Sequence, residues 1–257
     1  MRITDHPLYY SVHTRLRAFH IRRLLSSVRQ REVFCDVGCG LGYWLESEGK
    51  DYPLSVGLDN DQEGLHVNKR RGLKVMVQCI VNDIPLRDNC VDLVICSEVL
   101  EHLPDTLDQE SLIEMTRVLK TGGRMIITVP ALEGINARSK MRNLGHDDPS
   151  GGEYHYRMGY TKEMLLEYIH SIPTLTVSQH KYSMFLFSEL FMDLQKWVFY
   201  RTNKLKEHSD IMNAQNSLFF RVYKFFFPIL HLFFLLEDII LCPLLKGHIH
   251  IIELEKV

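Results

Sequence analysis

The stretch Asp36-Val37-Gly38-Cys39-Gly40-Leu41-Gly42 closes a short apolar run, Glu32 to Val37, with a cluster of glycines. An apolar run that stops at glycines is typical of a buried parallel strand. The glycines allow a tight turn from a strand into a helix and let the backbone approach a ligand closely. A dinucleotide-binding turn would read G-x-G-x-x-G, but Tyr43 stands where its third glycine should be. The turn therefore predicts a ligand site that differs from a conventional NAD site.

Four further strand-like runs follow along the chain: Leu54 to Leu58, Lys74 to Val81, Val91 to Cys96 and Gly123 to Val129. Helix-like segments separate them, such as Thr106 to Lys120, where apolar residues recur at helical spacing. Alternating strands and helices imply a parallel sheet with right-handed crossovers. Ligands of such sheets bind at the carboxyl ends of the strands. We therefore expect the functional residues there.

Residues suited to a nucleoside follow the next strands. Asp59 ends the second run, where a carboxylate can accept hydrogen bonds from both hydroxyls of a ribose. Asp83 follows the third run and can accept a hydrogen bond from an exocyclic amine, while Ile84 can offer its backbone. The fourth run leads into Ser97-Glu98-Val99-Leu100-Glu101-His102-Leu103.

These motifs together resemble class I S-adenosylmethionine-dependent methyltransferases. The segments DVGCGLG, LDND, NDIPL, VDLVICSEVLEHL and LKTGGRMIITVP follow one another in the order and spacing of that family, from about residue 33 to 130. The fourth segment is similar to the subgroup that reads vLEHL. The resemblance implies an α/β fold: a Rossmann-like sheet of about seven strands, mostly parallel with an antiparallel last strand, flanked by helices. It also implies an enzyme that uses S-adenosylmethionine.

The resemblance further implies which residues bind the cofactor. The three glycines would line its methionine moiety, Asp59 would hold the ribose, and Asp83 with Ile84 would hold the adenine. The complete set is Asp36, Gly38, Cys39, Gly40, Gly42, Asp59, Asn60, Asp83, Ile84, Ser97, Glu98 and His102.

Methyl transfer from a sulfonium is an in-line displacement in which positioning of the acceptor supplies much of the rate. An acceptor hydroxyl or ammonium must also lose a proton, which requires a general base. The candidates are His155, His102 and Glu98. His155 lies in Gly152 to Glu163, which is similar to the subgroup's GHxRxYTxxEL segment, although Tyr154 replaces the glycine before the histidine.

Charge and cysteine usage narrow the choice of partners. Lys+Arg 30 against Asp+Glu 32 gives a net charge of −2, which argues against a nucleic-acid partner. The six cysteines contain no C-x-x-C pair, so we expect no metal site and buried free thiols in a reducing compartment. The expected location is cytoplasmic, with the option of a peripheral position on the inner face of a membrane.

Two late segments, Leu175 to His180 and His248 to Leu254, predict the sixth and seventh strands. The stretch between these two strands is too long for a structureless loop in a compact domain. It is also rich in aromatic residues, because 11 of the 13 phenylalanines of the chain lie from Phe185 to Phe234. The chain thus divides into a basic N-terminal helix or lid (1–31), a cofactor-binding domain (32–184 and 247–257) and an inserted hydrophobic helical cap (185–246).

The sequences of the N-terminal helix and the cap are compatible with several kinds of binding partner. Six arginines and no acid lie between His6 and Arg31, and we expect these arginines to face outward while an apolar face closes over the cofactor. Cap and helix could contact a membrane surface or a lipid chain, form a plain core, or build a homodimer interface. We expect methyl transfer to an oxygen or nitrogen of a small amphipathic, lipid-linked or saccharide acceptor. The alternative is a non-catalytic peripheral membrane or scaffold protein that retains the fold.

Overall fold

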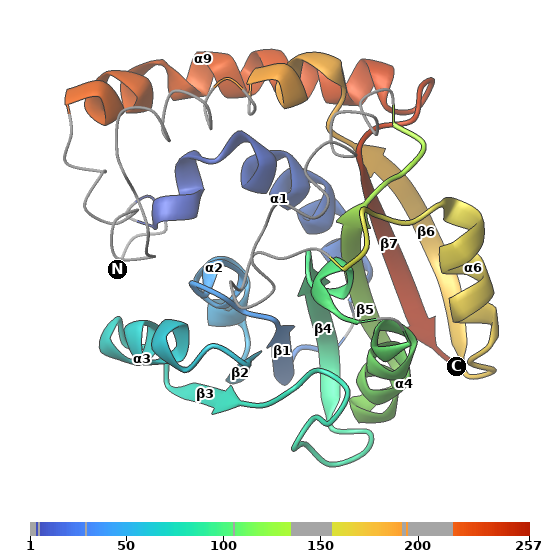
Figure 1. Cartoon of the computed structure of the whole chain (residues 1–257). Helices are drawn as coiled ribbons and strands as arrows, with labels where there is room; N and C mark the ends of the chain where they lie inside the picture. The colour runs from blue at the N-terminus through green and yellow to red at the C-terminus, as the bar shows by residue number, and fades with distance from the viewer. Residues whose placement is uncertain are drawn as a thin grey trace.

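One sheet of seven strands, in the order β3-β2-β1-β4-β5-β7-β6, forms the centre of the computed structural model (Figure 1). The structure describes residues 4, 6–28, 30–104, 106–134, 156–191, 194 and 218–257. The strands are β1 (Val33–Val37), β2 (Leu54–Asp59), β3 (Val75–Gln78), β4 (Val91–Ser97), β5 (Leu119–Pro130), β6 (Leu175–Ser183) and β7 (Ile249–Lys256). Strands β1 to β5 pair in parallel, whereas β7 runs antiparallel between β5 and β6. The predicted fold class is confirmed.

Strand β3 is shorter than the predicted Lys74 to Val81 because it is an edge strand with one partner. Its pairing with β2 ends where Asp59 meets Gln78. Strand β5 is longer than predicted, because it begins at Leu119, which pairs with Val91 of β4.

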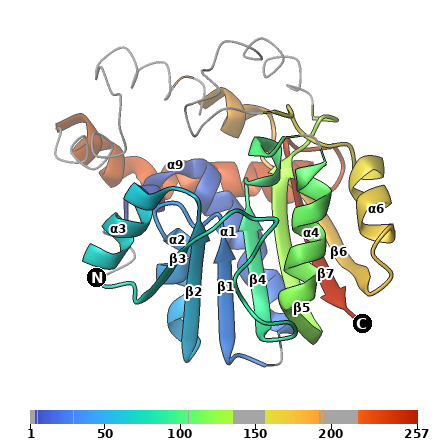
Figure 2. The ribbon, with the colours of Figure 1, turned by 60° about the horizontal axis from the view of Figure 1, so that its bottom comes forward.

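Helices cover both faces of the sheet (Figure 2). They are α1 (Val12–Leu24), α2 (Tyr43–Ser47), α3 (Gln62–Arg70), α4 (Leu107–Val118), α6 (Lys162–His170) and α9 (Leu218–Leu241), with short 3-10 turns η2 (Pro7–Tyr10), η3 (Leu25–Ser27), η4 (Gly49–Asp51) and η5 (Leu100–His102). Residues 186–191 are also helical. Within the described ranges, no helix combines the length and hydropathy that crossing a membrane would require.

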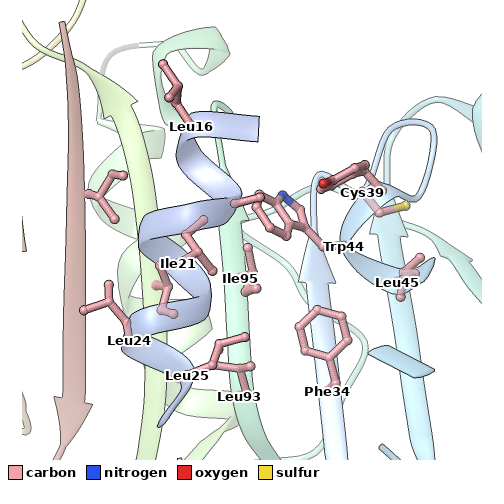
Figure 3. Packing of buried hydrophobic residues seen from close by; sticks show 14 of the residues in the cluster. Leu16, Ile21, Leu24, Leu25, Phe34, Cys39, Trp44, Leu45, Leu93 and Ile95 are labelled. Atoms are coloured by element: carbon pink, nitrogen blue, oxygen red, sulfur yellow. The ribbon is translucent and has the colours of Figure 1, made fainter. Parts of the chain in front are cut away.

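Successive residues of each central strand point to opposite faces of the sheet and belong to two different hydrophobic cores. Leu93 and Ile95 of β4 belong to the core that also contains residues of α1, α2 and α9, while Val94 and Cys96 belong to the core that contains residues of α4 and α6. Figure 3 shows Ile21 of α1 and Leu25 of η3 beside Leu93 and Ile95. Both faces of these strands are buried, and this explains why their sequences are apolar throughout instead of alternating.

Helix α9 lies along the outer side of α1, so that α1 is sandwiched between α9 and the sheet (Figure 1). Its inward residues Tyr223, Phe227 and Phe234 recur at helical spacing and are buried. Two buried acids near its C-terminal end hold it in place. Glu237 accepts hydrogen bonds from the backbone N–H groups of residues 187 and 188. Asp238 accepts from side chains of α1 and β6. The helix falls within the predicted cap, and residues 195–217 of that cap lie outside the described residues.

Candidate cofactor and active site

The turn after β1 forms a backbone cradle. Gly38, Gly40 and Gly42 all adopt left-handed conformations, with φ of +68°, +46° and +74°. A Cβ atom added to Gly38 would lie 2.3 Å from Cγ2 of Val99, whereas one added to Gly40 would meet no atom within 4 Å. Cys39 between them is buried. The half-buried Gly40 therefore faces open space at its Cα, where a ligand can approach the backbone more closely than a side chain would permit.

Replacing Gly40 with alanine should weaken binding of S-adenosylmethionine by at least about tenfold, because the new methyl group would occupy the cradle. The strained φ should cost only about 1 kcal/mol of folding stability. Gly122 is a matched control, since it too has a left-handed φ (+77°) and open space at its Cβ position, but lies in β5. Gly122→Ala should show the same loss in urea denaturation and unchanged binding in calorimetry. Equal affinities for both variants would contradict the assignment of the cradle.

Asp59 joins the end of β2 to this cradle. Its Oδ2 accepts a hydrogen bond from the N–H of Gly40 at 2.7 Å, and its Oδ1 accepts from the N–H of Asp61 at 2.9 Å. Each carboxylate oxygen can accept a second hydrogen bond, so the group can still bind a ribose hydroxyl. The neighbouring Asn60 is exposed, and its carbonyl oxygen accepts from Gln78 Nε2 at 3.1 Å.

Asp36, two residues before the cradle, is 1% exposed, and among the described residues only the backbone N–H of Leu45 approaches its carboxylate, without the geometry of a full hydrogen bond. Burial raises the pKa of Asp36 well above its usual value; the charge of Asp59 adds to this, and the backbone N–H of Leu45 opposes it. A positively charged ligand group would stabilise such a carboxylate. S-adenosylmethionine carries an ammonium and a sulfonium, so the residues present fit this cofactor.

Asp83 and Ile84, the two residues expected to bind the adenine, differ in their exposure to solvent. Asp83 is exposed, while Ile84 is buried. The Ile84 N–H, which was expected to face the base, donates to Glu114 Oε2 at 3.1 Å, and its carbonyl accepts from Arg117 Nη2 at 2.8 Å. Both backbone groups of Ile84 are thus engaged within the protein, and the exposed carboxylate of Asp83 is the group that could contact a base.

A cluster of polar side chains surrounds Glu98 at the ends of β4 and β5. Thr128 Oγ1 donates to Glu98 Oε1 at 3.2 Å and lies 2.9 Å from Ser97 Oγ. Arg17 Nη1 donates to Ser97 Oγ at 3.1 Å and lies 3.5 Å from Glu98 Oε1. His13 Nε2 lies 3.6 Å from Glu98 Oε2. We call these five residues the Glu98 cluster.

Glu98 itself has a φ of +58°, an uncommon conformation for a residue with a side chain. Such strain persists where the surrounding structure fixes it, and it is often found at functional sites. His102 is half-buried in η5, where its N–H donates to the carbonyl of Val99 at 3.0 Å. His155, the third candidate base, lies outside the described residues.

Arg17 corrects the expectation that the N-terminal arginines face outward. Its exposure is 9%, whereas Arg22 and Arg23 are exposed. The reason is its place on α1: it stands four residues after His13, so both point from the same face of the helix toward the sheet. Arg17, His13 and Thr128 were not among the site residues predicted from the sequence. The only signal was the i, i+4 pair of polar residues among the apolar positions of the helix.

His6 fastens the chain before α1 to the glycine turn. Its Nε2 donates to the carbonyl of Leu41 at 2.9 Å, and its Nδ1 accepts from the N–H of Leu8 at 3.1 Å. Burial lowers the pKa of His6 from 6.5 to about 4, and the charge of Arg71 lowers it further, against the raising effect of the Leu41 carbonyl. The ring is therefore neutral at pH 7 and pairs edge-on with Tyr43.

Acidification should destabilise the protein through this histidine. Because the folded pKa lies below the unfolded value of 6.5, its contribution is complete above pH 6.5 and is lost as the pH falls through about 4. The loss for His6 alone should reach roughly 3 kcal/mol in the free energy of unfolding at low pH. In urea titrations from pH 7.5 to 4, His6→Asn should show a shallower decline than the wild type. Parallel pH profiles would contradict this role.

Comparisons with known proteins agree with this geometry. Residues 35–127 match the model of a family described as a methyltransferase domain. The mouse protein named "Probable tRNA methyltransferase 9B" is 30% identical over 126 residues, which are 48% of this chain and 27% of that protein. The Arabidopsis thaliana tRNA (carboxymethyluridine(34)-5-O)-methyltransferase is 31% identical over 114 residues, 44% of this chain and 28% of that protein. The chain thus spans about a quarter of the length of these two relatives.

Solved structures show the same fold at low sequence identity. A SAM-dependent methyltransferase from Archaeoglobus fulgidus superimposes with a TM-score of 0.57 and 16% identity, covering 93% of this chain and 94% of that one. A candidate sarcosine dimethylglycine methyltransferase from Galdieria sulphuraria gives a TM-score of 0.62 and 16% identity, covering 94% and 85%. Residues 35–127 therefore form a methyltransferase domain, and the chain has the Rossmann-like fold of the class I methyltransferases, whose cofactor is S-adenosylmethionine.

Proposed function

We propose that this chain is an S-adenosylmethionine-dependent methyltransferase that acts on an oxygen or nitrogen of an amphipathic acceptor at a membrane surface. One observation carries the catalytic part of this proposal. An open glycine cradle, a carboxylate bonded to that cradle and the buried carboxylate of Asp36, which pairs with no cation among the described residues, lie together at the carboxyl ends of β1 and β2. These are the groups that a cationic, ribose-containing cofactor requires.

In this proposal the residues of the chain bind, orient and accept a proton. When bound, the cofactor supplies a methyl group already activated on a sulfonium. The cradle and Asp36 hold its amino-acid end, and Asp59 holds its ribose. Glu98, positioned by Arg17 and Thr128, can orient the acceptor or take up its proton. His102 and His155 remain the other candidate bases.

The outer face of α9 supports an amphipathic acceptor. Nine apolar residues on it are between 43% and 76% exposed: Val222, Phe225, Phe226, Ile229, Leu232, Phe233, Leu236, Ile239 and Ile240. Over 24 residues the helix is roughly 36 Å long. An apolar stripe of this size marks an interaction surface, and a helix with one such face lies readily in the plane of a membrane interface. A membrane-bound enzyme would meet lipid-linked acceptors directly.

RNA is the second candidate acceptor, because both relatives described above carry names of tRNA methyltransferases. The net charge of −2 does not favour broad electrostatic binding of RNA. The relatives' names nevertheless make RNA the acceptor class that a test must include.

Transfer of tritiated methyl groups can separate the candidates. The protein is incubated with labelled S-adenosylmethionine and either a total lipid extract in vesicles or total tRNA, with Asp59→Ala as the inactive control. We expect label in the lipid fraction and none in the tRNA. Label in the tRNA would contradict a lipid acceptor and would identify RNA as the acceptor class. Cofactor binding without label in either fraction would favour the non-catalytic alternative.

A further inference from the structure

A cavity of about 430 Å³ lies between the outer side of α1 and α9. It is separate from the Glu98 cluster, because Arg15, which lines it, is turned about 200° around the helix from both His13 and Arg17. Lys224 and His231 of α9 line its other wall. A second cavity of about 240 Å³ shares Arg15 and His231 with the first and is also lined by Arg22 and Arg23. The lining of the two cavities thus contains several basic side chains and no acid.

Aromatic rings, instead of carboxylates, hold two of these cations. The guanidinium carbon of Arg15 lies 4.4 Å from the ring centre of Tyr9, and Lys224 Nζ lies 4.9 Å from the ring centres of both Tyr10 and Phe220. No ion pair between described residues involves Arg15 or Lys224. Cation–π contacts position a charge but do not neutralise it. The positive charge therefore stays available to an anion.

Two polar atoms in the same lining lack hydrogen-bond partners. Arg15 Nε and His231 Nδ1 are both buried, and neither has a partner among the residues that the structure describes. Burial and the charge of Arg15 lower the pKa of His231 to about 4, so the ring is neutral at pH 7 and can donate one N–H. Unsatisfied buried polar groups are costly, and the oxygen atoms of an anionic group would accept from both.

The cavity adjoins the apolar face of α9. Leu232 belongs to both, since it lines the cavity and is 57% exposed. Pro228 in the same lining is also exposed. A ligand with its charged group beside Arg15 and Lys224 could therefore extend an apolar chain along α9, which runs along the outside of the molecule (Figure 1).

We propose that this cavity binds the phosphate headgroup of an anionic phospholipid whose acyl chains lie in the bilayer beside α9. The inference rests on the membrane contact proposed above and names the lipid class. Arg15 and Lys224 bind the phosphate, His231 donates to one of its oxygens, and the apolar residues of α9 contact the chains. Because α1 carries Arg15 on one side and Arg17 on the other, the bound lipid also fixes the helix that covers the Glu98 cluster.

Vesicle flotation of the full chain tests this site. The vesicles are phosphatidylcholine alone, or equimolar phosphatidylcholine and phosphatidylglycerol. The wild type should bind the anionic vesicles more tightly, and Arg15→Met and Lys224→Met should each lower that affinity about fivefold while binding to phosphatidylcholine is unchanged. Methionine keeps the apolar length of both side chains. Arg221→Met is the matched control, since Arg221 is exposed on the same helix one turn before Lys224 and does not line the cavity. It should change the affinity less than twofold.

The outcomes of these measurements distinguish a failure of the headgroup site from a failure of the membrane contact. If Arg221→Met weakens binding as much as Lys224→Met, general surface charge explains the preference and the headgroup site is refuted. If the wild type floats with neither vesicle, the membrane contact fails together with the site. Calorimetry with inorganic phosphate and with dihexanoyl phosphatidylglycerol below its micelle concentration separates a lipid site from a free-phosphate site, and equal affinities would overturn the lipid assignment. Binding of S-adenosylhomocysteine should be unchanged in all three variants, which shows that they are folded.

Discussion

Asp59→Ala should lower the affinity for S-adenosylmethionine by about 100-fold or more. The carboxylate is expected to hold both ribose hydroxyls, and it also holds the N–H of Gly40 in the cradle at 2.7 Å. A hydrogen bond to a charged group contributes about 1.5–3 kcal/mol, so the loss of two exceeds the free energy that corresponds to a 100-fold change. Calorimetric titration of both proteins measures the difference directly.

Asp61→Ala is the control for this experiment. Asp61 stands two residues further on and caps α3, because its side chain accepts from the N–H groups of Glu63 and Gly64, both at 3.0 Å. Its loss should cost about 1 kcal/mol of stability and leave cofactor affinity nearly unchanged. An Asp59→Ala protein that is folded and binds the cofactor like the wild type would refute the ribose assignment.

Asp238→Ala should cause a large loss of stability, about 3–5 kcal/mol. Asp238 is 1% exposed and accepts from His20 Nε2 at 2.5 Å, from Ser183 Oγ at 2.9 Å and from the backbone N–H of Met184 at 2.5 Å. Removing it leaves these three donors from α1, β6 and the segment after β6 without their acceptor, together with the Cys242 thiol, which donates to Asp238 Oδ1 at 3.1 Å. The attachment of α9 to the rest of the molecule depends on these bonds.

Urea denaturation monitored by fluorescence checks this second expectation. Asp88→Ala serves as the comparison, because Asp88 also pairs with a base, Arg117, but is 67% exposed. An exposed ion pair contributes at most about 1 kcal/mol. If the two variants lose similar amounts of stability, Asp238 is not the anchor of α9 that its contacts indicate.

The sheet and the cradle could be predicted from the sequence because their signals are local. The buried strands are continuous apolar runs, and their carboxyl ends carry Asp36, Asp59 and Ser97 in a fixed order. A parallel sheet with right-handed crossovers brings these ends to one edge without further information. The parallel pairing of β1 to β5 agrees with this prediction, and the antiparallel β7 agrees with what the family resemblance implied.

The rest of the site depends on contacts between distant parts of the chain. Arg17 reaches Ser97 across 80 positions, and nothing near Arg17 in the sequence indicates that α1 packs over the end of β4. The Ile84 N–H is taken by Glu114 because α4 packs beside that loop, which no motif reveals. The role of Asp238 likewise becomes visible only when α9 lies on α1.

Calorimetric titration of the purified wild-type chain with S-adenosylmethionine and S-adenosylhomocysteine tests the central claim most directly. The cradle, Asp36 and Asp59 lead us to expect saturable binding of both, one molecule per chain, with affinity in the micromolar range or tighter. Absence of binding by a chain that circular dichroism shows to be folded would contradict the cofactor assignment and every catalytic role derived from it.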